Sequence, residues 1–167
     1  MPDVNVQHAL RLPPVPALSA VKELLHEMAA DQGIWRDFPL HADLRDLGLP
    51  DLGYIAVPVR LELGPPRDEM PNALPVRIQA KRNPDAFPIF DGRIGVDGSG
   101  PSSSTMWLAG TYETPRNRVA AFVDAAMLGK VADLTLRNFV DDLAEAAQRE
   151  GERSEIAAVR YRLFDRS

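Results

Sequence analysis

The sequence contains no cysteine, so disulfide bonds and thiolate metal sites are excluded. It has no apolar run of the roughly 20 residues that a membrane-spanning helix needs. The N-terminal stretch "MPDVNVQHALRLPPVP" lacks the basic and apolar regions of a secretory signal peptide. Positive charge is not in excess, because 19 Lys and Arg stand against 24 Asp and Glu, a net charge of −5. We therefore expect a cytoplasmic protein with no membrane span and no nucleic-acid partner.

Motifs that carry chemistry are also scarce. His8, His26 and His41 lie on three separate segments and show no metal-ligand spacing. There is no phosphate-binding loop, dinucleotide-binding glycine motif or nucleophile elbow. The glycine-rich stretch "DGSGPSSS" precedes a strand, which is typical of a hairpin turn. We predict no metal and no cofactor, and the sequence identifies no catalytic residue.

The sequence does contain enough apolar material for a core. Its 167 residues are 45% hydrophobic and 26% charged, a balance typical of globular proteins. No repeat or low-complexity tract divides the chain. We therefore expect residues 1–167 to form one domain, with 152–167 as a C-terminal extension.

Alternating apolar and polar residues predict several strands. In "YIAVPVRLEL" the side chains of Ile55, Val57 and Val59 share one face, and Pro58 indicates an edge position or a bulge. Similar alternation occurs in "VNVQHALRL", "FPLHADL", "LPVRIQAK", "FPIFDGRIGV" and "TMWLAGTYE". The fifth of these six segments is expected to bulge near Asp91–Gly92.

Two helices are predicted. The first follows "PPVP", carries Leu18, Val21, Leu24, Leu25 and Met28 at helical spacing, and stops before Gly33. The second has Thr114 as N-cap and Pro115 at its first position, and extends to about Arg149. One stripe of this second helix should face the core: Phe122, Ala125, Gly129, Ala132, Leu136, Val140, Leu143 and Ala147. A helix of this length can cross a whole sheet.

The tail "GERSEIAAVRYRLFDRS" fits two structures. The spacing of Ile156, Val159 and Leu163 suits a helix, whereas "VRYRLF" suits a strand. We favour the helix. The order of elements predicts an α+β architecture, in which an antiparallel sheet of six or seven strands wraps around the long C-terminal helix.

The long helix has two unusual features. The middle of its core stripe is small, and Gly129 there costs about 1 kcal/mol relative to alanine. Either the sheet approaches closely at this point or a void remains, and both alternatives stay open. A second apolar line consists of Val119, Val123, Met127 and Val131, continued by Leu134. Such a line is seldom left exposed, so the first helix or a second copy of the chain in a homodimer should cover it.

Three stretches together resemble a known family. They are "FPIFDGRIGV", "LAGTYETP" and "MLGKVADLTLRNFVDDLA", and "IAVPVRLELG" agrees with them. Over about residues 54–147 the chain resembles the polyketide-cyclase-like, START-related (SRPBCC) helix-grip proteins, which include the Bet v 1/START-like folds. The resemblance implies a hydrophobic molecule held between sheet and C-terminal helix. Some relatives are cyclases, dehydratases or lipid carriers, but no catalytic residue carries over from the motifs.

We expect a mainly apolar cavity for a lipid- or polyketide-like small molecule. Its predicted lining is Phe87, Phe90, Met106, Leu108, Tyr112, Phe122, Gly129 and Leu136. Asp91 is a candidate cavity acid or base, although a turn or bulge aspartate is the commoner role. Tyr112 is a candidate ligand-binding phenol, although a core tyrosine bonded to the backbone is the commoner role.

Three functions are compatible with these expectations. The first is binding of an apolar molecule without an assigned reaction. The second is a cyclase- or dehydratase-type enzyme, which would need two converging polar groups such as Asp91 and Tyr112 in the cavity. The third is an interaction or dimerisation module with a filled core, which would have no pocket.

Overall fold

The computed structural model describes residues 3–48, 51, 53–82, 84, 87–113 and 125–164. Six strands form one sheet: β1 (Asp3–Leu10), β2 (Pro39–Asp43), β3 (Tyr54–Leu63), β4 (Ala73–Ala80), β5 (Ile89–Gly100) and β6 (Ser103–Glu113). Their order is β1-β6-β5-β4-β3-β2, and all five neighbouring pairs are antiparallel. The helices are α1 (Pro14–Ala30) and α2 (Ala125–Phe164), with short 3-10 helices η1 (Gly33–Trp35) and η2 (Leu44–Leu47). The predicted antiparallel sheet with a long C-terminal helix is confirmed.

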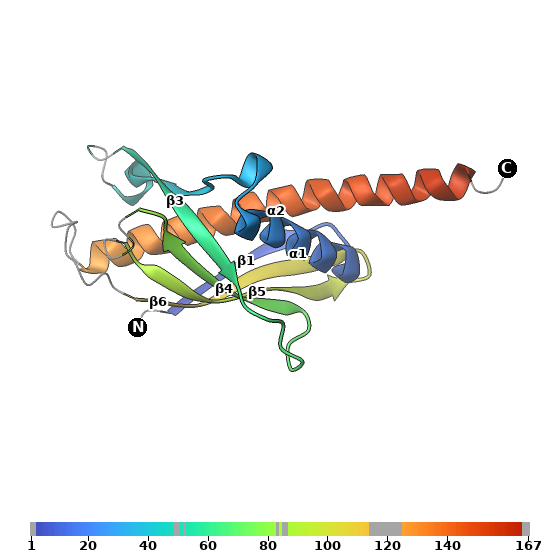
Figure 1. Cartoon of the computed structure of the whole chain (residues 1–167), viewed down its shortest axis with the longest axis horizontal. Helices are drawn as coiled ribbons and strands as arrows, with labels where there is room; N and C mark the ends of the chain where they lie inside the picture. The colour runs from blue at the N-terminus through green and yellow to red at the C-terminus, as the bar shows by residue number, and fades with distance from the viewer. Residues whose placement is uncertain are drawn as a thin grey trace.

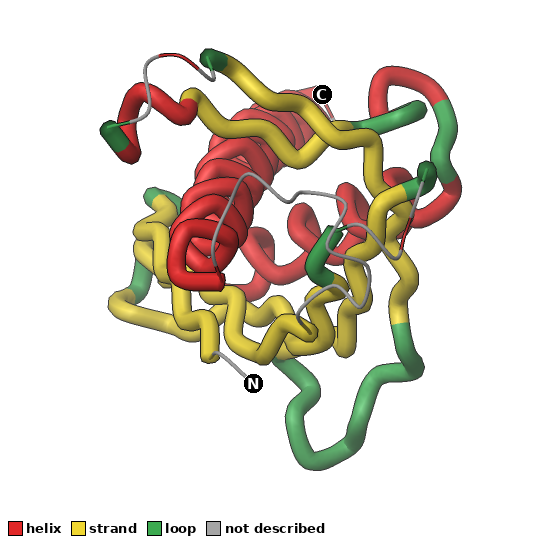
Figure 2. Tube along the Cα trace, turned by 90° about the vertical axis from the view of Figure 1, so that its left-hand side faces the viewer, coloured by secondary structure: helices red, strands yellow, loops and turns green. Residues whose placement is uncertain are grey.

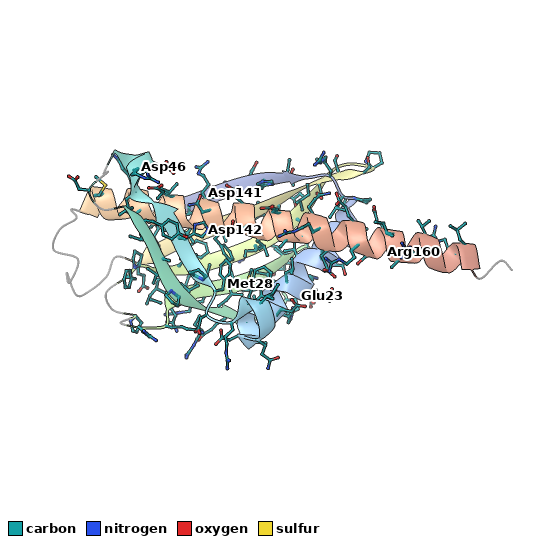
Figure 3. The ribbon with its side chains drawn as sticks, turned by 90° about the horizontal axis from the view of Figure 1, so that it is seen from above. Glu23, Met28, Asp46, Asp141, Asp142 and Arg160 are labelled. Atoms are coloured by element: carbon teal, nitrogen blue, oxygen red, sulfur yellow. The ribbon has the colours of Figure 1, made fainter. Side chains whose placement is uncertain are left out.

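The sheet curls so that both of its edge strands lie beside α2 (Figure 2). On β1, the imidazole Nε2 of His8 lies 3.8 Å from a carboxylate oxygen of Asp141. On β2, the imidazole Nε2 of His41 lies 2.6 Å from a carboxylate oxygen of Asp142, and Asn138 donates a hydrogen bond to the His41 carbonyl. Figure 3 shows Asp141 and Asp142 on the part of α2 that lies over the sheet. Consecutive aspartates thus fasten the helix to the two opposite edges of the sheet, and the helix covers those edges.

The first helix fills one end of the space between sheet and α2. α1 lies beneath the middle of α2 and does not extend under its first turns (Figures 1 and 3). Pro13 and Pro14 begin α1, where a missing N–H costs nothing. The largest fully buried side chains are Leu12, Val21 and Leu25 around α1, Phe139, Val140 and Leu143 of α2, and Ile78, Met106 and Leu108 of the sheet. They form one core cluster.

The C-terminal part of α2 passes the turn between β1 and α1 and then leaves the body. The Arg11 N–H donates to Gln148 Oε1 at 2.9 Å, and Gln148 Nε2 donates to the Arg11 carbonyl at 3.2 Å. A side chain at Gly151 would collide with the buried Leu12. Beyond Gly151 the helix projects away from the sheet as far as Phe164 (Figure 1). The predicted end at Arg149 is therefore wrong, and the helix favoured for the tail is confirmed as far as Phe164.

Other predictions from the sequence either lie outside the described residues or differ from the structure. The predicted cap at Thr114 and start at Pro115 lie outside the described residues, as do Phe122, Val119 and Val123. The bulge predicted near Asp91–Gly92 is wrong, because β5 pairs regularly with β6 at both positions. The shift in register lies between Gly98 and Gly100, where the hairpin turns. Neither helix that the structure describes is both long and apolar enough to cross a membrane.

Candidate functional site

A cavity of about 230 Å³ lies between the first described turns of α2 and the sheet. The sheet contributes Leu40, Ile55, Val57, Val59, Ile78, Gln79, Ala80, Phe90 and Tyr112 to its wall. The remaining wall residues are Leu44 of η2, Phe87 and Pro88 before β5, and Val131, Ala132, Thr135 and Leu136 of α2. No Asp, Glu, His, Lys or Arg is among these described wall residues. The cavity is therefore suited to an uncharged, mainly apolar molecule.

The position of the cavity follows from the pairing of β3. Residues 54–58 of this strand pair with β2, and residues 59–63 pair with β4. Pro58 lies where β3 changes its partner, so its missing N–H leaves no gap within a continuous ladder. Ile55 and Val57, on the half of β3 that does not pair with β4, both line the cavity. Phe87 lies at its rim and is 38% exposed.

The floor of the cavity depends on two glycines. Gly92 of β5 and Gly110 of β6 are register partners. A Cβ atom at Gly92 would lie 2.6 Å from the ring atom Cζ of Phe90, and one at Gly110 would lie 2.8 Å from the same atom. The Phe90 ring thus occupies the space that two side chains would otherwise fill. It contributes an aromatic surface to the floor of the cavity.

The roof of the cavity is built from small residues of α2. Ala132 and Thr135 line the space directly. Gly129 lies against the hydroxyl of Tyr112, because a Cβ atom there would be 2.7 Å from Tyr112 Oη. Close packing therefore accounts for Gly129, and the residues of α2 that line the empty space begin at Val131.

Besides Gln79 of β4, two residues with hydroxyl groups, Tyr112 and Thr135, are the polar residues of the described cavity wall. Tyr112 is only 5% exposed, and the described residues offer its hydroxyl no hydrogen-bond partner. Burial raises the pKa of Tyr112, and the Asp133 carboxylate raises it further, so the phenol is neutral at physiological pH. The second hydroxyl, Thr135 Oγ1, donates to the Ala132 carbonyl at 2.9 Å and keeps lone pairs available.

The structure distributes the predicted site residues among several environments. Phe87, Phe90, Tyr112 and Leu136 line the cavity, and Gly129 borders it through Tyr112. Phe122 lies outside the described residues. Met106 and Leu108 are fully buried but do not line the cavity. They pair with Val96 and Ile94, nearer the end of β5 and β6 that α1 covers.

Asp91 is not a cavity group. The inward residues of β5 include Phe90 and Ile94, so alternation directs Asp91 to the outer face. There its carboxylate lies 3.6 Å from the guanidinium of Arg77, its cross-strand partner. The same alternation was visible in the sequence and predicts this position.

Part of the cavity wall that the sequence did not identify comes from the far edge of the sheet. These residues of the wall belong to β2, η2 and β3, which are distant in sequence from β5 and β6: Leu40, Leu44, Ile55 and Val57. Their inward direction could be read from the alternation. Their nearness to Tyr112 depends on the curl of the sheet, which the sequence pattern does not specify.

The second apolar line of α2 is described only in part. Val131 lines the cavity and Met127 is half-buried within the single chain. Dimerisation through this line remains a prediction. Over the described ranges, no three His, Asp or Glu side chains gather closely enough to hold a metal ion.

No protein-family model matches the chain, and no curated protein matches it. Solved structures do. A conserved protein from Geobacillus kaustophilus aligns over 92% of this chain and 97% of its own, with a TM-score of 0.52 and 17% identity. Ara h 8.0201 aligns over 91% of this chain and 98% of its own, with a TM-score of 0.51 and 10% identity. A START superfamily protein from Mycobacterium smegmatis is similar at a TM-score of 0.46 and 15% identity, over 90% and 97% of the two chains.

The first two likenesses extend over nearly the whole of each chain and show a shared fold. With its curled antiparallel sheet and long C-terminal helix, the chain has the Bet v 1/START helix-grip fold. The fold implied by the sequence resemblance is confirmed. At such low identities the likeness concerns the fold alone.

Proposed function

We propose that this protein binds a small apolar molecule in the cavity beneath the first described turns of α2. The observation that carries the proposal is a cavity of about 230 Å³ whose described wall has no ionisable group other than the neutral phenol of Tyr112. Concave sites lined mainly by apolar side chains are the usual binding sites of small molecules. The resemblance to helix-grip proteins that hold hydrophobic molecules supports the same function.

Among the described wall residues, the enzymatic alternative does not find the groups that it needs. A cyclase or dehydratase requires converging acid and base groups. Asp91 is on the outer face of the sheet, so Tyr112 has no carboxylate or imidazole beside it among the described wall residues. A filled-core interaction module is disfavoured too, because it would have no cavity. Binding without an assigned reaction is the function that this geometry supports best.

Indane, a compact bicyclic hydrocarbon, is a suitable probe. Calorimetric titration should detect its binding to the wild-type protein. At a free concentration of one hundred times its dissociation constant, it should stabilise the fold by about 2.7 kcal/mol. The melting temperature should then rise by about 5–10 °C for a chain of this size.

Ala132→Leu is the decisive variant, because its side chain would occupy the cavity directly. It should abolish indane binding while leaving the protein folded. Ala157→Leu makes the same change on the exposed part of α2 and should bind indane as the wild type does. Equal binding by the Ala132→Leu variant, or no binding of indane and naphthalene to the wild type, would contradict the proposal.

A further inference from the structure

The hydroxyl of Tyr112 is a feature of the cavity wall that an apolar ligand alone does not explain. A buried phenol normally has a hydrogen-bond partner, since leaving it unpaired costs free energy. Here the side chain is almost completely buried and lines the cavity, but Oη is not among the fully buried polar atoms and keeps access to the cavity, and the described residues provide no partner for it. A phenylalanine would fill the same place but would offer the cavity no hydrogen-bond donor.

The surroundings of Oη hold it in position. The backbone at Gly129 lies so close that a Cβ atom added there would be only 2.7 Å from Tyr112 Oη. Tyr112 pairs with Phe90 across the β5–β6 ladder, and the Phe90 ring lies over Gly92 and Gly110. The phenol is therefore confined between the helix and an aromatic floor, with the cavity as the space open to it.

The charge of the wall limits what Oη can meet. An ionised carboxylate or phosphate buried without a cationic partner is strongly disfavoured. The described wall offers no Lys, Arg or His. The negative charge of Asp133 acts on Tyr112 and would also oppose an anion placed there. A ligand that meets Tyr112 must therefore be neutral.

The volume of the cavity indicates the size of the ligand. The cavity has a volume of about 230 Å³. Drug-sized ligands usually occupy pockets of about 300–1,000 Å³. One or two rings fit this space, whereas a four-ring polyketide or a sterol would have to extend beyond it.

We infer that the ligand is a neutral molecule of one or two rings bearing a single oxygen, a cyclic or aryl ketone or a phenol, and that this oxygen accepts a hydrogen bond from Tyr112 Oη. The inference rests on the proposed function and narrows it. Phe90 and Phe87 supply aromatic faces for the rings. The lone pairs of Thr135 Oγ1 are available to accept a hydrogen bond when the oxygen of the ligand is itself a hydroxyl.

The test compares 1-indanone with indane, which differ by one carbonyl oxygen. In the wild type, the hydrogen bond should offset the desolvation of the carbonyl, so that 1-indanone binds at least as tightly as indane. In Tyr112→Phe, the affinity for 1-indanone should fall by roughly five- to tenfold relative to that for indane. Indane-1-carboxylate, at a pH where it is ionised, should not bind to either protein.

The outcomes separate the two proposals. If indane binds and Ala132→Leu abolishes that binding, but Tyr112→Phe leaves the ratio of the two affinities unchanged, this inference is overturned and the proposed function stands. If neither compound nor naphthalene binds to the wild type, the proposed function fails and this inference fails with it. Tight binding of the carboxylate would also overturn the inference.

A second measurement needs no variant, in case Tyr112→Phe does not fold. The carbonyl stretching band of 1-indanone bound to the wild type should lie at lower wavenumber than in a hydrocarbon solvent, because a hydrogen bond weakens the C=O bond. An unshifted band would overturn the inference.

Discussion

The two halves of the gripped part of α2 face different interiors. From Phe139 to Ala147 the helix meets a filled core, in which Phe139 and Leu143 are fully buried. From Val131 to Leu136 it faces a cavity. The helix is continuous and the sheet runs beneath both halves, so the difference comes from α1, which lies under only one of them (Figure 1).

This comparison shows how one helix-grip framework combines stability with a binding space. Phe139, Val140 and Leu143 are fully buried where α1 supports α2, and Gly129, Ala132 and Thr135 occur where it does not. α1 has 17 residues and is shorter than the part of α2 that lies over the sheet, from Ala125 to Gly151, so it cannot fill the whole length of the groove. The filled end supplies most of the packing, and the hollow end can remain open because of it.

The largest expected effect comes from shortening one side chain in the filled half of α2 and one in the half that faces the cavity. Leu143→Ala removes a fully buried side chain from the filled core, whereas Leu136→Ala enlarges a space that already exists. We expect a loss of about 3–5 kcal/mol in the free energy of unfolding for Leu143→Ala and nearer about 2 kcal/mol for Leu136→Ala. Urea unfolding measures both. Equal losses would mean that the two ends are packed alike.

The sequence predicted the direction of side chains better than their place along the groove. Alternation correctly identified the inward faces of β5 and β6, including Phe90, Leu108 and Tyr112. It could not tell that Leu108 lies in the filled core and Tyr112 at the cavity. That division depends on how far α1 reaches along the groove between the sheet and α2, which is a tertiary property.

The curl of the sheet was likewise beyond a local pattern. Leu40 and Val57 were recognisable as apolar strand residues, but only the three-dimensional pairing brings β2 and β3 around toward α2. Pro58 carried a usable signal, because a proline cannot donate to a ladder. The predicted edge or bulge corresponds here to the point where β3 changes partners.

A smaller effect should appear where α2 approaches the phenol. Gly129→Ala gains up to about 1 kcal/mol from helix propensity, but the added Cβ atom crowds Tyr112 Oη in the wild type. In a Tyr112→Phe background the crowding disappears and the gain should be realised. Thermal unfolding of the four proteins of this double-mutant cycle should show a coupling of about 1 kcal/mol. Additive effects would mean that the hydroxyl does not constrain the helix at Gly129.

A pH-dependent contribution should come from the ion pairs that hold the C-terminal end of α1. Lys81 Nζ lies 2.6 Å from a carboxylate oxygen of Asp31 and 2.7 Å from one of Asp37. The hydrogen bond from Lys81 lowers the pKa of Asp31 below its ordinary value of 3.8, and the bond to Asp31 raises the pKa of Lys81 above 10.5. The stabilisation should therefore be present between these values and lost as the pH falls below about 3.8 or rises beyond 10.5.

Lys81→Met tests this contribution. The difference in unfolding free energy between wild type and variant should be constant from pH 7 to pH 5 and shrink toward pH 3. The two carboxylates are exposed to solvent and Lys81 is half-buried, so the difference should be small. Lys22→Met is the matched control, because Lys22 donates to the neutral Pro71 carbonyl and its effect should not change in this acid range. A difference that grows in acid would contradict the assignment.

The smallest effect is expected beyond both halves, in the part of α2 that leaves the body. After Gly151 the described side chains are exposed, including Ile156 at 56% and Leu163 at 71% (Figure 3, where Arg160 marks this part). Gln148 and Gly151 make the last contacts with the turn before α1. Ending the chain after Glu152 should therefore leave the midpoint of urea unfolding and the affinity for indane unchanged, because no buried contact is removed.

A truncation after Asp142, which removes Leu143 and Ala147, is the contrasting control and should prevent folding. If the shorter truncation lowers the unfolding midpoint, residues 153–167 stabilise the protein through a contact that the projecting helix of a single chain does not provide, and analytical ultracentrifugation of the full chain would show whether that contact is with a second copy.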